Sequence, residues 1–456
     1  MNEKKYEIDM SRGPMLMNLL RFAMPLLLTG VLQLFYNAAD IVVVGRFSGS
    51  DSLAAVGSTG SAVNLIINIF TGLSVGTAVA VSKAFGANDV KELSRTVHTS
   101  FLLSIILGIF VGVFGFFISK PLLHAMGTPD NVMPKASLYL KIYFAGMPLN
   151  MIYVFGTAIL RSVGDTKRPL YYSAVSGILN IVLNLIFVIF FKMDVAGVAT
   201  ATIIAQALSG ILVIKCLTNS VSSYRVDIKS LKIHKDELLL MIRIGLPAGL
   251  QGTVFSLSNV VIQSSVNLFG SVIMAGNAAA ANLEGFIYIS MNSLYHAALT
   301  MSGQNYGAGN FKRIKHGTLL CSAVVTCIGL SLGMLFLVFG RQMLGIYSTD
   351  PAVISAGMDR AKIIFSTYFL CGLMEAMVGS LRGLGYSVMP MIVSLLGACG
   401  LRLLWIFTIF AADKTTSVLY LSYPVSWFIT TSVHLICLVF ALRKRRREYE
   451  LSANQI

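Results

Sequence analysis

Long apolar runs separated by short polar segments make up most of this chain. A helix needs about twenty mainly apolar residues to cross a bilayer, and twelve runs reach that length. Helices are the expected form because backbone groups in lipid must be hydrogen-bonded within their own segment. The pattern predicts an all-α polytopic membrane protein with twelve transmembrane helices, at residues 16–44, 53–82, 96–118, 136–160, 170–191, 195–217, 240–268, 276–301, 317–340, 358–381, 388–411 and 418–442.

The polar segments set the expected domain boundaries. The longest internal one is basic and divides the chain near its middle. The polar N-terminal segment precedes a run that is too long for the core of a signal peptide, so no cleaved signal is expected. We expect an N-lobe of six helices over 1–217, a cytoplasmic linker over 218–239, a C-lobe of six helices over 240–442 and a basic cytoplasmic tail over 443–456.

The two halves of the chain carry an internal repeat. From Gly86 to Pro169 they align without gaps at an offset of 221 residues, and the first helix matches the seventh at an offset of 222. The matched glycines, prolines and basic residues are Gly86 with Gly307, Gly108 with Gly329, Gly112 with Gly333, Lys141 with Lys362, Arg161 with Arg382, Gly164 with Gly385 and Pro169 with Pro390. Each repeat has six helices, an even number, so both enter the membrane from the same side. This predicts two parallel repeats related by an axis along the membrane normal, as in two-lobed secondary transporters.

Composition sharpens this picture and excludes several classes of protein. The chain is 55% hydrophobic and only 12% charged, whereas soluble domains carry roughly 25% charged residues. A soluble enzyme, a disordered chain and a disulfide scaffold are therefore excluded. The six cysteines lie in or beside apolar runs and show no metal-ligand spacing, so no metal site or cofactor is expected.

The net charge is +15, and the distribution of the basic residues predicts the orientation of the chain in the membrane. With both termini inside, 25 Lys and Arg residues lie on the inner side and 8 on the outer side, with Lys141 and Arg402 inside helices. Basic residues concentrate on the cytoplasmic side of membrane proteins, so we expect a multi-pass protein of the cell membrane with cytoplasmic termini. Because the basic residues are dispersed in short loops, a nucleic-acid partner is not expected.

Polar side chains inside the predicted helices are the candidate functional groups. Ionisable groups in lipid are costly and usually face a cavity, although polar stripes also hold helices together through hydrogen bonds. Asp40, Lys141, Glu284, Glu375 and Arg402 are the ionisable candidates. Estimated depths place Glu284 and Arg402 at a similar level, and we hypothesise that they pair.

Several segments resemble the MATE (multidrug and toxic compound extrusion) family. FYNAADIVVVGRFSG, AFGANDVKE, LRSVGDTKRP, GLPAGLQG and QNYGAGNFKRI carry the resemblance, which runs through both halves. It implies a V-shaped bundle of two six-helix lobes. It also implies ion coupling at Asp40, in the Asn37-to-Asp40 stretch, with partners at Tyr139, Asn180, Asn184 and Thr202. Some relatives have a second Asp where this chain has Asn184, so H+ and Na+ remain alternatives.

The expected activity is secondary antiport, because the sequence has no phosphate-binding GxxxxGK[ST] loop. Organic, cationic amphipathic drugs or metabolites would leave by alternating access in exchange for H+ or Na+, with the protein a monomer in the bilayer. The alternative is a flippase of the same superfamily that moves a lipid-linked or anionic substrate. An enzyme is not expected, since no HExxH or nucleophile-elbow motif occurs. Pro25 and Arg402 are assigned structural or gating roles, and the expected substrate contacts are Gln33, Tyr36, Asn259, Gln263, Glu284, Tyr288 and Glu375.

Overall fold

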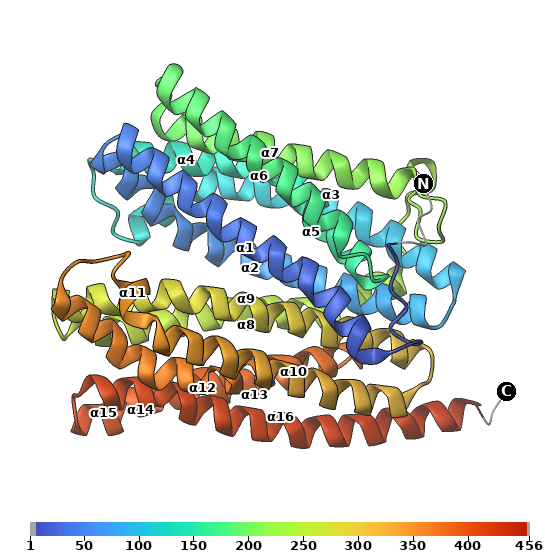
Figure 1. Cartoon of the computed structure of the whole chain (residues 1–456). Helices are drawn as coiled ribbons and strands as arrows, with labels where there is room; N and C mark the ends of the chain where they lie inside the picture. Colours follow the sequence, from blue (N-terminus) through green and yellow to red (C-terminus); the bar gives the residue numbers. More distant parts are fainter. Residues whose placement is uncertain (1–5, 454–456) are drawn as a thin grey trace. The chain divides into compact units, whose positions relative to one another are not determined.

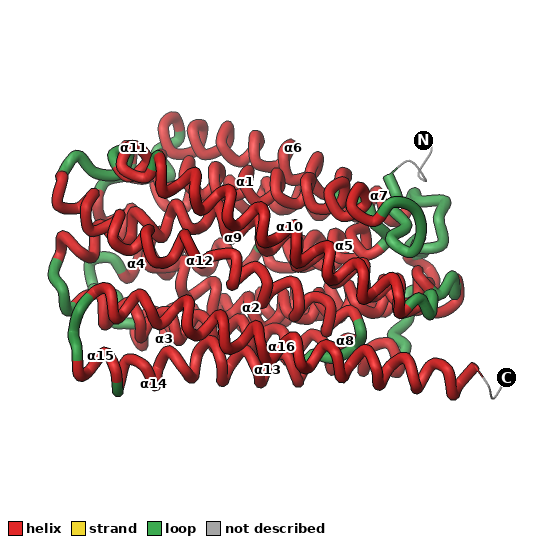
Figure 2. The backbone as a smooth tube through the Cα atoms, turned by 60° about the horizontal axis from the view of Figure 1, so that its bottom comes forward, coloured by secondary structure: helices red, strands yellow, loops and turns green. Residues whose placement is uncertain are grey.

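The computed structural model describes residues 6–453, with the side chains of all of these except 50, 61, 62, 65, 452 and 453. Within this range helix predominates and no strand occurs (Figure 2). Eleven helices of the described part are long and apolar enough to cross a membrane, and one bent helix pair makes twelve. The predicted all-α class with twelve spans is therefore confirmed.

The chain forms two compact units. Unit 1 comprises the residues up to Ile8, Pro25–Phe85 and Asp89–Gly249, and unit 2 comprises Asp9–Met24, Gly86–Asn88 and the chain from Leu250 on. The helices of unit 1, blue to green in Figure 1, run side by side, and so do those of unit 2, yellow to red. Apart from the parts of α1 and α8 described below, the helices of unit 1 are α2 (Ser50–Gly86), α3 (Val90–Ala125), α4 (Met133–Ala145), α5 (Met147–Ser162), α6 (Lys167–Leu185) with its π-helical end Ile186–Phe190, and α7 (Asp194–Thr218).

Two long helices are divided between the units. Helix α1 (Met15–Phe47) belongs to unit 1 from Pro25 on, and α8 (Lys235–Asn267) belongs to unit 1 as far as Gly249. Glycines explain the second division. A Cβ atom on Gly72 of α2 would lie 2.2 Å from the backbone nitrogen of Gly249, so only glycine permits α2 and α8 to approach this closely. The first half of α8 therefore packs with unit 1, although the polar linker predicted a boundary before residue 240.

Unit 2 holds the remaining helices. They are α9 (Ser271–Gly307), α10 (Phe311–Val338), α11 (Gly340–Leu344), α12 (Pro351–Gly383), α13 (Val388–Ser394), the π-helical segment Leu395–Gly400, α14 (Leu401–Phe407), α15 (Ile409–Ala412) and α16 (Thr416–Ala453). Helices α13 to α15 form one span, Val388–Ala412. The π-helical turn matters for function, because its wider winding turns the following residues to a different face.

The fourth predicted span, residues 136–160, is bent rather than straight. It consists of α4 and α5, which meet at Gly146 at an angle of 53°. Pro148 is the second residue of α5, where its missing N–H and its ring oppose continuation of the helix from α4. The run was identified correctly, but hydropathy alone did not reveal the bend.

The internal repeat reappears as equivalent helix packing in the two units. A Cβ on Gly108 would lie 2.6 Å from the Cα of Pro148, and a Cβ on Gly329 would lie 2.9 Å from the Cα of Phe369. Pro148 and Phe369 are themselves separated by the offset of 221 residues. The matched glycines therefore serve close helix packing, which is the common role of a GxxxG pattern in membranes.

The predicted linker packs onto unit 1. The 3₁₀ turn Ile228–Ser230 lies within it, and the side chains of Tyr224 and Val226 are fully buried in an apolar cluster of that unit. The backbone N–H of Asp227 donates to His98 Nε2 at 3.0 Å. Apolar burial and this bond hold the segment against α3.

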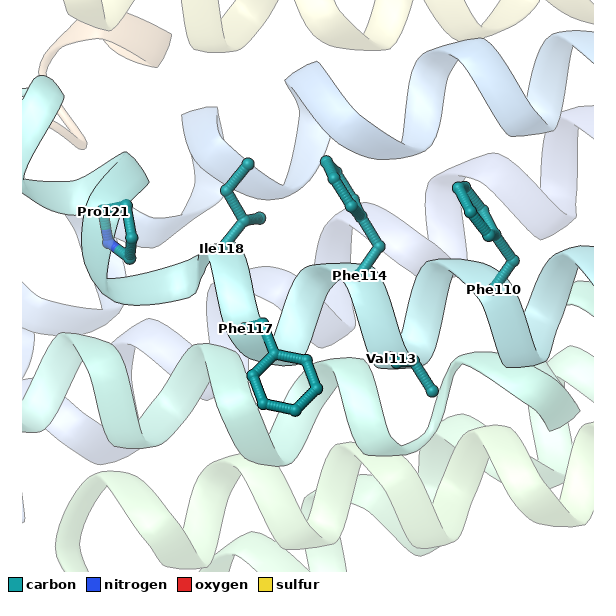
Figure 3. A pocket seen from close by; sticks show the side chains of 6 residues that line it. All are labelled: Phe110, Val113, Phe114, Phe117, Ile118 and Pro121. Carbon is teal, nitrogen blue, oxygen red and sulfur yellow. The ribbon is translucent and has the colours of Figure 1, made fainter.

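The surface of the helices is strongly apolar, as expected where lipid is the solvent. Phe117 of α3 is 75% exposed, and Figure 3 shows it with the other side chains that line an open depression on this helix: Phe110, Val113, Phe114, Ile118 and Pro121. These residues all come from one helix, and none of them is ionisable. The depression therefore fits an apolar, lipid-covered surface.

Candidate functional site

A polar chain begins at Asp40 in unit 1. The amide nitrogen of Asn184 donates to Asp40 Oδ1 and to Asn180 Oδ1, the latter at 3.4 Å. Asn180 in turn donates to Thr202 Oγ1 at 3.4 Å. Helices α1, α6 and α7 thus bring together four of the residues predicted for ion coupling. The spacing of Asn180 and Asn184, one helical turn apart, places both amides on one face of α6.

The surroundings of Asp40 leave its carboxylate without a cation. Asp40 is partly buried, Asn184 is fully buried, and Tyr139 is only 9% exposed. No Lys, Arg or His nitrogen of the described residues lies within 4.0 Å of the Asp40 carboxylate. The buried Asn184 Oδ1 has no hydrogen-bond partner among them either. The site therefore offers oxygen atoms in apolar surroundings, which is the ligand type that hard cations such as Na+ take.

Other predicted residues of α1 lie outside this polar chain. Tyr36 donates its hydroxyl to the carbonyl oxygen of Ala174 at 3.3 Å. Gln33 and Asn37 are exposed, and the structure gives them no hydrogen-bond partner in the described part of the chain. Pro25 lies within an unbroken helix, and the Thr29 hydroxyl donates to its carbonyl oxygen at 2.8 Å.

A second polar chain lies in unit 2 and contains an ion pair. Arg360 of α12 donates one Nη to Glu284 Oε2 and the other to Asn277 Oδ1. Asn277 donates to Gln263 Oε1 at 3.2 Å, and Gln263 donates to Asn267. Arg360 is 7% exposed and Glu284 17% exposed. Arg360 therefore neutralises the Glu284 carboxylate within the protein, whereas Asp40 has no such partner among the described residues.

The hypothesis that Glu284 pairs with Arg402 is wrong, because Arg360 is the partner. The predicted span 358–381 begins only two residues before Arg360, which places this residue at the outer end of the span. Helix α12 begins earlier, at Pro351, capped by Asp350, and so carries Arg360 into the buried interior. The π-helical turn before Arg402 also changes the face that this residue presents, which equal depth could not reveal.

Arg402 instead lies among aromatic rings. Its guanidinium carbon is 4.2 Å from the ring centre of Tyr423 and 5.4 Å from that of Trp427. Its Nε donates to Ser426 Oγ at 2.9 Å. A guanidinium over aromatic faces is a favourable cation–π arrangement. Helix α16 supplies all three partners.

The remaining candidates of unit 2 have different surroundings. Glu375 is partly buried and makes no ion pair or hydrogen bond with a described residue, but it lies within electrostatic reach of Tyr288. Tyr288 is 43% exposed and Asn259 is exposed. Sequence reasoning missed Arg360 as the partner of Glu284. Arg382, which the internal repeat matches with Arg161, donates to Tyr295 and Gln251 in the interior.

The comparisons with known proteins agree with this architecture. The MatE family model matches residues 25–186 and 247–408. The chain is 30% identical over 395 residues to "Probable multidrug resistance protein YpnP" of Bacillus subtilis (strain 168), covering 86% of this chain and 88% of that protein. It is 26% identical over 345 residues to the "FAD transporter" of Shewanella oneidensis, covering 74% and 75%.

A solved structure shares the fold at low sequence identity. It is described as the outward-facing conformation of a multidrug resistance MATE family transporter of the MOP superfamily. The TM-score is 0.90 at 20% identity, with 97% of this chain and 99% of that chain covered. Two family matches that cover most of both halves, a relative at 30% identity and this fold lead to one conclusion. The chain belongs to the MATE family, and it is a multi-pass membrane transporter and not an enzyme.

Proposed function

We propose that the protein is an antiporter that exports organic cations in exchange for H+ or Na+ by alternating access. The observation that carries this proposal is the Asp40 carboxylate, which has amide donors but no cationic partner among the described residues. A carboxylate in apolar surroundings has an energetic cost of several kcal/mol. A bound proton or Na+ removes most of that cost.

The coupling of ion entry to substrate export follows from the difference in energy between Asp40 with a bound proton or Na+ and Asp40 without one. Loading neutralises Asp40, so a conformation in which the carboxylate is more deeply buried becomes accessible. Asn184, Asn180 and Thr202 would relay the change to α6 and α7, because they connect Asp40 to both helices. Asn184 Oδ1 is an additional oxygen for Na+, whereas H+ needs only the carboxylate.

Glu375 and Tyr288 support a cationic substrate. The Glu375 carboxylate has no basic partner within ion-pair distance in the described part of the chain, and Tyr288, which is 43% exposed, lies within its electrostatic reach. A carboxylate next to an aromatic face attracts an organic cation through both charge and quadrupole. Glu284 is less suited to this role because Arg360 already neutralises it.

A second candidate is transport of an anionic substrate. Few basic residues lie inside the predicted helices, which by itself disfavours an anionic substrate. The buried positions of Arg360 and Arg402 remove that objection. The relative named "FAD transporter" also bears the name of an anionic molecule.

Transport in proteoliposomes tests the antiport proposal. Ethidium efflux is followed under an imposed pH gradient and, separately, an imposed Na+ gradient. Asp40→Asn should abolish gradient-driven efflux, because the amide has no charge to neutralise. Asp359→Asn is the matched control, since Asp359 lies on the surface in an exposed pair with Lys362, and it should transport normally. Full efflux by Asp40→Asn under both gradients would refute the coupling assignment.

We further propose that both termini are cytoplasmic and that the transporter acts as a monomer. The excess of basic residues in the predicted inner loops supports the orientation. Labelling of single cysteines introduced at residues 3 and 455 by a membrane-impermeant maleimide tests it in intact cells. Labelling before the cells are opened would reverse the orientation.

A further inference from the structure

The Arg402 guanidinium has an unused hydrogen-bond donor. The residue is 4% exposed, and the rings of Tyr423 and Trp427 lie near its guanidinium. Its Nε is satisfied by Ser426, but its Nη2 is buried and finds no acceptor in the described part of the chain. Cation–π contacts act through the ring face and the charge, so they do not replace a hydrogen bond in the guanidinium plane. A buried donor without an acceptor is rare and calls for an explanation.

The charges around Arg402 also indicate that an anion binds there. Arg360 lies 5.8 Å from the centre of the same Tyr423 ring, so the two guanidinium carbons are at most about 10 Å apart. Glu284 pairs with Arg360, and no described carboxylate oxygen lies within 4.0 Å of Arg402. Two guanidiniums and one carboxylate leave one positive charge uncompensated. In a low-dielectric interior such a charge strongly attracts an anion.

The neighbouring charges do not cancel this excess. Glu375 lies one helical turn beyond Cys371 on α12 and is within electrostatic reach of Arg382, but it makes no ion pair with Arg402 or with any other described residue. Arg382 itself donates to the neutral groups of Tyr295 and Gln251. The two arginines around Tyr423 therefore form a separate, net cationic cluster within unit 2.

We propose that Arg402 binds the anionic group of a transported molecule, a carboxylate, sulfonate or phosphate attached to a planar ring. The fork of a guanidinium matches the oxygens of such groups in its own plane, and Tyr423 and Trp427 supply faces for the ring. This inference rests on the proposed transport function and on its second candidate, an anionic substrate. Because Nη2 is buried, binding requires a side chain that covers it to move.

The chain carries its own reporter for this site. It has two tryptophans, Trp405 and Trp427, and Trp405 donates its Nε1 to the carbonyl oxygen of Val418. In Trp405→Phe the fluorescence comes from Trp427 alone, directly beside Arg402. Two matched quenchers are titrated into this variant in lipid nanodiscs without any ion gradient: 4-nitrobenzoate, which is anionic, and 4-nitrobenzamide, which is neutral and of nearly the same shape.

We expect saturable quenching by 4-nitrobenzoate at a concentration at least tenfold lower than for 4-nitrobenzamide. Arg402→Met should reduce the affinity for the anion at least tenfold, to the level of the amide, and Arg402→Lys should restore part of it. Arg341→Met is the control, because Arg341 is exposed in the short helix α11, and it should bind as the parent does. Equal affinities for the two quenchers in the parent would overturn the proposal, even if Arg402→Met does not fold.

The outcome is separable from that of the transport assay. Discrimination between the quenchers without any gradient-driven efflux would refute the antiporter and leave the anion site standing. Efflux that depends on Asp40, without discrimination, would refute the anion site alone.

Discussion

Removal of the Glu284 carboxylate should destabilise the protein through Arg360. Glu284→Gln leaves a buried guanidinium without its counterion, since Arg360 is only 7% exposed. Loss of one partner from a buried ion pair costs about 3–5 kcal/mol. Because Glu284 is 17% exposed and water can reach it, we expect a loss near the lower end, about 3 kcal/mol.

The same geometry predicts rescue by a second substitution. In Glu284→Gln with Arg360→Met both charges are gone, and pairs replaced in this way often return to within about 1 kcal/mol of the parent. Arg360→Met alone should also destabilise the protein, because it leaves the Glu284 carboxylate unpaired, so the coupling energy between the two positions should be at least about 2 kcal/mol. Arg402 makes no ion pair with Glu284, so the cycle of Glu284→Gln with Arg402→Met should give a clearly smaller coupling energy than the cycle with Arg360→Met.

Equilibrium unfolding by SDS in mixed detergent micelles measures both cycles. The free energy of unfolding is compared for the parent, the three single variants and the two double variants. Equal coupling energies in the two cycles, or a coupling energy near zero for Glu284 with Arg360, would refute the assignment of the pair.

Two further predictions concern packing and the loop before α6. Gly333→Ala places a Cβ 2.3 Å from the carbonyl oxygen of Phe365 and should destabilise the folded protein by about 1–3 kcal/mol through overpacking. A Cβ on Gly60 would have no described heavy atom outside its own helix turn within 4 Å, so Gly60→Ala should leave the thermal midpoint unchanged or raise it. Equal shifts of the thermal midpoint in the two variants would contradict this prediction. Burial raises the pKa of the Asp165 carboxyl to about 6, so the folded state binds the carboxyl proton more tightly than the unfolded state does. The stability that this protonation contributes is lost as the pH rises through about 6. Asp165→Asn should reduce the pH dependence of the thermal midpoint between pH 4 and pH 6.5. An unchanged pH dependence in this variant would exclude Asp165 as its cause.

The candidate site was predictable where local spacing decides it. Asn180 and Asn184 share a face of α6 because they are one turn apart, and the resemblance to the MATE family linked them with Asp40. The bonds from Asn184 to Asp40 and from Asn180 to Thr202 agree with that expectation. Gln33 and Asn37 have the same spacing on α1 but are exposed. Helical spacing predicts which residues share a face, but it does not predict which of them contact another helix.

The sites of unit 2 depended on information that spacing does not contain. The Glu284 partner was misassigned because depth along a helix leaves the direction around the helix axis open. The π-helical turn Leu395–Gly400 shifts that direction for Arg402, and hydropathy is insensitive to one extra residue per turn. Arg360 was missed because it lies near the outer end of the predicted span 358–381, whereas α12 begins at Pro351 and places Arg360 in its buried interior.

The sequence by itself determined the solvent, the number of spans and the repeat. Composition requires lipid as the solvent, lipid requires helices, and matched glycines and prolines recur at a constant offset because both halves pack in the same way. Only the tertiary structure decided which polar groups meet, where α4 ends and α5 begins, and which arginine neutralises Glu284. The reason is that apolar burial is set by the composition of each segment, whereas a hydrogen bond or ion pair needs two atoms from distant segments within about 3 Å of each other.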